Sequence, residues 1–198
     1  FDADDVDLGF STVTGSPSPL AAGLDVSSTT VGVTAVTATW TGYDSDPLEL
    51  TFVGAPVVAG DVVLNELLAD GTAGDANEDG SVDGDEDAFV EIVSVASVDL
   101  SLEGAAIYES ELTSLPRHTF GDVTLGIGGA VVVFGGGSPG AAPLGSEWFA
   151  ADNASDPGTP FFLHLDPLGD IVELRDAGGT TVFSFPYGNE AGGAPNAN

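Results

Sequence analysis

The sequence has no cysteine and no lysine, and it contains no long uninterrupted apolar run. Without cysteine, disulfide bonds, thiolate metal sites and thiol nucleophiles are all excluded. An exported domain that lacks disulfides must be stabilised by its core, by bound ions or by assembly. The nearest candidate for a membrane span, residues 126–137, is short and broken by glycine, whereas a spanning helix needs roughly 20 apolar residues. We therefore expect no membrane span.

The chain starts at Phe1, without an initiator methionine or an apolar leader. This start predicts that a signal peptide has been removed and that the protein is secreted, either extracellular or held at the cell surface. The absence of disulfides is compatible with export but does not establish it.

The charge balance is extreme, because 32 acidic residues face only Arg117 and Arg175, for a net charge of −30. Such a chain repels nucleic acid and anionic lipid, so neither is expected as a partner. Two environments tolerate this self-repulsion. One is high salt, where the Debye length falls to about 3 Å at 1 M and a halophilic protein keeps its acidic surface. The other is a millimolar concentration of divalent cations, and the composition leaves both explanations open.

Short β-rich runs separated by Gly, Pro, Asp and Ser recur along the chain, and helical periodicity is nearly absent. This pattern predicts an all-β sandwich or barrel. The run at residues 130–134 (AVVVF) is apolar throughout, which indicates a central strand covered on both faces. The other expected strands are at residues 29–40, 48–53, 61–68, 89–95, 161–165, 170–174 and 180–185.

Three segments follow from this pattern: residues 1–59, a main domain at 60–188 and a polar C-terminal tail at 189–198. The first segment holds too few strands for a sandwich, and an open sheet leaves an unpaired edge. Residues 1–14, with Val6, Leu8 and Phe10 at strand spacing, are a candidate strand for donation to another subunit. An ordinary strand within the same chain explains the same spacing.

Residues 75–86 (DANEDGSVDGDE) match the calcium loop of an EF-hand position by position. Gly80 stands where the chain must turn sharply, and Val82 stands where such loops usually anchor to a core. Asp87 follows Glu86 directly, so either residue is a candidate for the last ligand. The predicted calcium ligands are Asp75, Asn77, Asp79, Ser81 through its carbonyl group, Asp83, and Glu86 or Asp87.

No helix is expected on either side of this loop, so the calcium site would be inserted between strands. A loop that leads directly into a strand at each end favours a structural ion over a sensor that opens. The competing interpretation is an acidic, solvated loop in a halophilic protein.

Four stretches resemble the lamin tail domain of microbial secreted proteins: 61–70 (DVVLNELLAD), 75–93 (DANEDGSVDGDEDAFVEIV), 117–137 (RHTFGDVTLGIGGAVVVFGGG) and 169–179 (GDIVELRDAGG). Their order and spacing agree with that family over residues 60–188. The resemblance implies an immunoglobulin-like β-sandwich used as an accessory or surface module. It also implies a cation in the loop between the first two strands, on Asp75, Asn77, Asp79, Ser81, Asp83 and Asp87. The family usually has an acidic residue where this chain has Ala88, so any ligand role there is lost.

No catalytic constellation emerges from the sequence, which predicts a non-enzymatic protein. His118 and His164 stand outside any zinc-binding motif, and no G-x-S-x-G nucleophile turn is present. The glycine clusters at 126–129 and 135–140 follow no phosphate-binding pattern and are interpreted as turns. Asn153 begins an N-glycosylation triplet, which is a weak signal.

Two functional hypotheses follow. The first is a calcium-stabilised structural subunit that self-assembles into an extracellular or cell-surface filament, a homo-polymer made through residues 1–59. The second is a calcium-dependent adhesion module of a larger surface protein, which binds a protein or a glycan. The candidate contact residues for adhesion are the aromatic ones, Trp40, Tyr43, Trp148 and Phe149.

Overall fold

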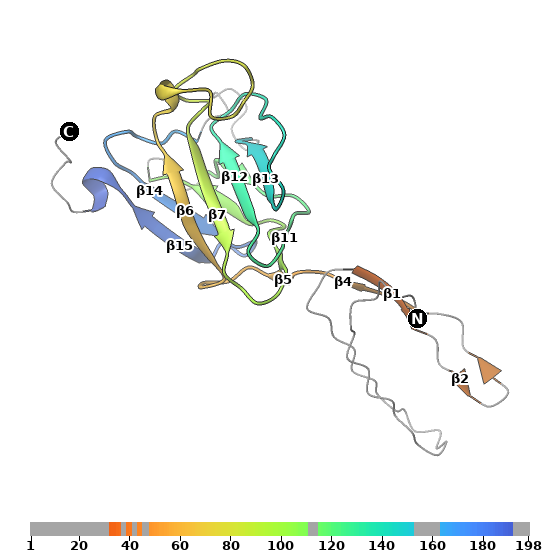
Figure 1. Ribbon diagram of the computed structural model, residues 1–198. Helices are drawn as coiled ribbons and strands as arrows, with labels where there is room; N and C mark the ends of the chain where they lie inside the picture. The colour runs from red at the N-terminus through yellow and green to blue at the C-terminus, as the bar shows by residue number, and fades with distance from the viewer. Residues whose placement is uncertain are drawn as a thin grey trace. The chain divides into compact units, whose positions relative to one another are not determined.

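The protein is all-β, and its chain divides into two compact units, Phe1–Gly54 and Ala55–Asn198. The structure, a computed structural model, describes residues 32–36, 39–40, 43–44, 48–110, 115–152 and 163–191 (Figure 1). Regular helix in these ranges consists of two short 3-10 turns. No helix among these residues has the length and apolar character needed to cross a membrane.

The first unit contains two small antiparallel sheets among its described residues. Strand β1 (Gly32–Val36) pairs with β4 (Leu48–Phe52), and β2 (Thr39–Trp40) pairs with β3 (Tyr43–Asp44). The expected strand at 29–40 therefore contains two strands, β1 and β2. The candidate donor strand at residues 1–14 lies outside the described residues.

One layer of the second unit is a four-stranded sheet with the order β13-β12-β7-β6 (Figure 1). Its strands are β6 (Val62–Leu68), β7 (Phe89–Ser94), β12 (Ala130–Phe134) and β13 (Ser146–Ala150). Strand β12 is central, with buried side chains from Val131 onward, so the prediction of a covered strand is confirmed. It pairs antiparallel with β7 and parallel with β13.

Two smaller sheets form the opposite layer. One has the order β10-β9-β14-β15, and the other has the order β11-β8-β5. The strands of the first are β9 (Ala106–Tyr108), β10 (His118–Thr119), β14 (Ile171–Arg175) and β15 (Thr181–Pro186). Those of the second are β5 (Ala55–Pro56), β8 (Leu100–Ser101) and β11 (Thr124–Leu125).

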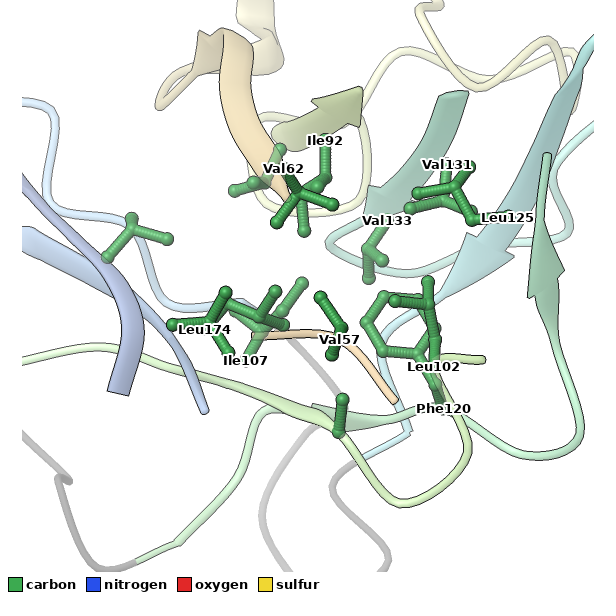
Figure 2. Close-up of a cluster of buried hydrophobic side chains, with 14 of the residues drawn as sticks. Val57, Val62, Ile92, Leu102, Ile107, Phe120, Leu125, Val131, Val133 and Leu174 are labelled. Atoms are coloured by element: carbon green, nitrogen blue, oxygen red, sulfur yellow. The ribbon is translucent and has the colours of Figure 1, made fainter. Parts of the chain in front are cut away.

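A single hydrophobic core fills the space between the layers (Figure 2). Ile92 on β7 and Val133 on β12 face Ile107 on β9 and Leu174 on β14, and all four side chains are buried. Phe120 fills the space beside Leu102 (Figure 2). This two-layer packing is that of a β-sandwich; its closer assignment to the immunoglobulin-like type stays a prediction.

The structure differs from the expected strands in one range that is not a strand and in several strands that were not expected. The strand expected at 161–165 is wrong in its described part, because residues 163–165 are not extended in a sheet. His164 has a φ of 56°, a left-handed conformation that a strand does not accept. The predicted ranges did not include the edge strand β13 or the short strands β3, β5, β8, β9, β10 and β11.

The boundary between the two units also differs from the expected one. Ala55 pairs with Leu100 and Val57 is buried in the core, so the second unit begins at Ala55 and not at residue 60.

Candidate metal centre in the loop between β6 and β7

The acidic loop, residues 69–88, joins two neighbouring antiparallel strands. Leu68 at the end of β6 is paired with Phe89 at the start of β7, so the loop leaves and returns at one end of the sheet (Figure 1). It opens with η1 (Gly71–Ala73), whose first turn is capped by Asp70: the carboxylate accepts the Thr72 N–H at 3.0 Å. The loop is thus flanked by strands on both sides, as the sequence predicts.

Asp87 holds the acidic loop together from its buried end. Its side chain is 1% exposed, and Oδ1 accepts the N–H groups of Ala76 at 2.7 Å and Asn77 at 3.0 Å. Oδ2 accepts the N–H of Asp83 at 2.8 Å. Both oxygens of Asp87 are therefore engaged by the backbone of the loop, at its beginning and its middle. A carboxylate that accepts several N–H groups in this way orders the chain around it.

The other predicted ligands form a chain of side-chain-to-backbone hydrogen bonds. The Asp79 N–H is shared between Asp75 Oδ1 at 3.1 Å and Asn77 Oδ1 at 3.0 Å. Asp75 Oδ2 also accepts the Gly80 N–H at 3.0 Å. Gly80 has a φ of 94°, so the sharp turn expected at this position is present. Asp83 closes a similar turn by accepting the Glu86 N–H at 3.2 Å.

A second loop, residues 135–145, lies against the acidic loop and is fixed to it by the backbone. The Gly136 N–H donates to the Glu86 carbonyl at 3.2 Å, and the Gly140 N–H donates to the Asn77 carbonyl at 2.8 Å. The Asn77 side-chain amide returns a bond to the Gly136 carbonyl at 3.3 Å. We call this segment the glycine lid. Sequence analysis treated its glycines as ordinary turns and missed this contact.

Gly137 lies directly over three polar side chains of the acidic loop. A β-carbon there would be 2.5 Å from Asn77 Nδ2, 2.5 Å from Asp79 Oδ2 and 3.4 Å from Glu86 Oε2. The φ of Gly137 is 73°, which also favours glycine. The lid can therefore approach the acidic loop this closely only because position 137 has no side chain.

Glu86 is in an electrostatically unfavourable position. Its pKa is raised, first by partial burial and then by the charges of Asp83, Asp79 and Asp87. No lysine is present to offset these charges, and the two arginines of the chain pair instead with Glu109 and Glu173. The region therefore carries several carboxylates without a basic side chain to neutralise them.

The loop does not have its carboxylates arranged as a finished chelating site. Across the described ranges, no three His, Asp or Glu side chains converge closely enough to hold a metal ion. The oxygens of Asp75, Asp83 and Asp87 accept N–H groups instead, and Ser81 is exposed. Val82 is 59% exposed, so the expectation that it anchors the loop to the core is wrong. Asp87, which was predicted as a ligand, performs the anchoring.

The remaining candidate residues lie elsewhere. His118 is buried, with its ring 4.7 Å from that of Phe120 and 5.5 Å from that of Phe149, and its Nδ1 is 3.4 Å from Asp152 Oδ1. Trp148 packs edge-to-face on Phe134 at 5.1 Å. Asn153 and the side chains of Trp40 and Tyr43 are outside the described part of the chain.

The fold and the loop together define an all-β sandwich with a strongly acidic connection at one end of its main sheet. No protein-family model matches the chain, and no curated protein matches it. The resemblance to lamin tail domains stays a prediction that rests on the residues quoted for it above.

Proposed function

We propose that the protein is a non-enzymatic, exported structural protein whose lamin-tail-like sandwich is stabilised by calcium bound in the acidic loop. The observation that carries the proposal is the uncompensated charge around Glu86 beneath the glycine lid. Removing like-charge repulsion between gathered carboxylates is what a bound divalent cation does well.

The side chains and carbonyl groups of the acidic loop supply the oxygen ligands that a hard cation prefers. Calcium prefers carboxylate, amide and carbonyl oxygens, and the loop contains all three kinds. Asp79 and Glu86 would be the main charged ligands, because both lie under Gly137. Asp75 and Asp83 would join them by exchanging a backbone N–H for the ion. Asp87, whose two oxygens hold the loop, would position the ligands and not bind the ion itself.

The ion would act as a structural clamp between two connections. The acidic loop belongs to the β6–β7 pair, whereas the glycine lid follows β12, and backbone hydrogen bonds already join them. A cation at Asp79 and Glu86 would tie the lid more firmly to the sheet. Because the strands on either side are paired, binding has no hinged helices to open, which favours stabilisation over signalling.

Self-assembly through the first unit is the second part of the proposal. Its described strands form two separate two-stranded sheets, and such sheets are marginal by themselves. Addition of a strand from another subunit would complete one of them, with main-chain hydrogen bonds supplying affinity. The expected product is an extracellular or cell-surface homo-polymer.

A binding role is the alternative, and one row of side chains on the main sheet favours it. The strand register places Glu66, Glu91, Val132 and Trp148 opposite one another across four strands. Trp148 is partly exposed on the edge strand β13, and Glu91 and Glu66 follow it in the row beyond Val132. An aromatic face beside hydrogen-bonding acids is a surface on which a sugar ring or a peptide could pack.

The experiment combines electron microscopy with thermal unfolding, in calcium and in excess chelator, at low and at high NaCl. We expect filaments, and a melting temperature that falls on chelation even in high salt. The double variant Asp79→Asn with Glu86→Gln should lose the calcium response, whereas Asp122→Asn, an exposed carboxylate outside the loop, should keep it. Stability that depends on salt alone contradicts the calcium clamp. Monomers under all conditions contradict assembly and leave the binding module.

A further inference from the structure

A second acidic group lies at the end of the core, where three neighbouring strands β9, β14 and β15 terminate or begin. The Ser110 N–H, just after β9, donates to Asp170 Oδ1 at 3.0 Å. The Tyr187 N–H, just after β15, donates to the Asp170 carbonyl at 2.9 Å. Asp170 itself immediately precedes β14. The three residues therefore lie side by side across the sheet.

The two oxygens of the Asp170 carboxylate have very different surroundings. Oδ1 accepts the N–H and the hydroxyl of Ser110 and the N–H of Ile171. Oδ2 is also buried, yet within the described part of the chain it has no hydrogen-bond partner. Asp170 is 1% exposed, so bulk water does not solvate this oxygen. A buried carboxylate oxygen without a partner is costly, which makes it a marker for an additional group.

The charge balance nearby calls for a positive group. Glu109 is buried too, and it forms a hydrogen-bonded ion pair with Arg117, whose Nε donates to Oε1 at 3.1 Å. Arg117 thus pairs with Glu109, while Asp170 shows no basic partner of its own among the residues that the structure describes.

A neutral oxygen is available from Tyr187, whose backbone N–H is hydrogen-bonded to the Asp170 carbonyl. The Tyr187 hydroxyl donates to the Asp166 carbonyl at 3.0 Å. The pKa of Tyr187 is raised by burial and then by the charges of Asp170, Asp166 and Glu109. Tyr187 therefore lies in a region that is both acidic and partly desolvated.

We propose that Asp170 Oδ2 binds a hard metal cation, with the hydroxyl oxygen of Tyr187 as a neighbouring neutral ligand. The burial of Asp170 excludes a peptide or any larger partner. A water molecule would satisfy the hydrogen bond but would leave the charge. Because no three acidic side chains converge among the described residues, neutral oxygens must complete the site. One missing positive charge and neutral ligands favour Na⁺ over Ca²⁺.

This site shares no residue with the acidic loop, so it stands or falls independently of the proposed calcium clamp. A protein with net charge −30 is stabilised by any salt through screening, so the test must separate binding from ionic strength. Choline chloride provides that control, because choline is too large for a buried carboxylate oxygen.

The first test compares melting temperatures in NaCl and in choline chloride at equal ionic strength, with chelator present. We expect wild-type protein to melt about 3 °C or more higher in NaCl. The difference should persist in Asp122→Asn and in the loop variant Asp79→Asn with Glu86→Gln, and it should vanish in Asp170→Asn. Equal melting temperatures of the wild type in the two salts overturn the proposal. In the loop variant without chelator, a larger gain from micromolar CaCl₂ than from NaCl would identify calcium as the ion.

A second test does not depend on the folding of a variant. Crystals of the wild-type protein soaked in thallium(I), a stand-in for alkali cations with strong anomalous scattering, should show an anomalous peak beside Asp170 Oδ2. An ordered water there, with no anomalous peak, overturns the proposal.

Discussion

Gly137 lies so close to Asp79 that a β-carbon on the glycine would be 2.5 Å from the carboxylate oxygen Oδ2. The two residues belong to different connections, one after β12 and one between β6 and β7. Their proximity means that the glycine lid covers part of the acidic loop. The candidate metal centre is therefore a product of two loops, and each can be changed separately.

Gly137→Ala should destabilise the fold by about 2–4 kcal/mol, because it adds both a steric clash and a strained backbone. Gly145→Ala is the matched control: its φ is 86°, but no atom lies within 4 Å of the place that a β-carbon would take there. That control should lose only about 1–2 kcal/mol, the cost of the left-handed conformation. Urea unfolding measures both variants. Equal losses would show that the lid does not press on the acidic loop.

Asp87→Ala should destabilise the protein by about 2–4 kcal/mol, because three loop N–H groups lose their acceptor. Asp85→Ala, two residues earlier and exposed, is the control and should change stability little. The loss for Asp87→Ala should persist in excess chelator, since Asp87 orders the loop without an ion. A loss seen only with calcium present would instead make Asp87 a ligand.

Glu86→Gln should stabilise the calcium-free protein at neutral pH and reduce its response to calcium. Burial and neighbouring carboxylates raise the pKa of Glu86 above 4.5, its ordinary value. The folded state then holds this proton more tightly than the unfolded chain, so the stability it contributes below pH 4.5 is lost as pH rises through the folded pKa. Calorimetry between pH 4 and 7, with chelator present, measures how the unfolding free energy changes with pH. An unchanged slope in Glu86→Gln would refute this account.

His118 should produce a pH dependence of the opposite sign. Burial lowers its pKa from 6.5, although the charge of Asp152 opposes the shift. The unfolded chain therefore binds the proton more readily, so stability is fully present above about pH 6.5 and is lost as pH falls through the folded pKa. His118→Phe should reduce the pH dependence of the unfolding free energy, measured with urea between pH 7.5 and 5. His164→Asn, at an exposed position, should leave that dependence unchanged. A slope that survives His118→Phe assigns the effect to other groups.

The apolar strands were predictable because their residues carry the pattern locally. Val131 to Phe134 are apolar in succession, and β7 alternates buried and partly buried side chains around Val90 and Ile92. The strand expected around His164 failed because one left-handed residue breaks an otherwise apolar run, and no sequence period encodes that φ.

The acidic loop shows the same division between local and distant information. The turn at Gly80 was predictable from the glycine itself, and the grouping of the acidic residues was predictable from their spacing. The contact with the glycine lid was not predictable, because the hydrogen bond between Gly140 and Asn77 joins residues far apart in sequence. The burial of Asp87 was equally hidden, because an acidic residue in an acidic stretch gives no sign that it faces inward.

The parallel pairing of β12 with β13 has a consequence for the order in which the chain folds. A parallel neighbour cannot be reached by a tight hairpin, so the chain must travel back from the end of β12 to the start of β13. Residues 135–145 form this connection, and backbone hydrogen bonds to the carbonyl groups of Glu86 and Asn77 fix its path. We therefore expect the edge strand β13 to dock after the acidic loop has taken its shape, and to be the first strand released when that loop is disturbed.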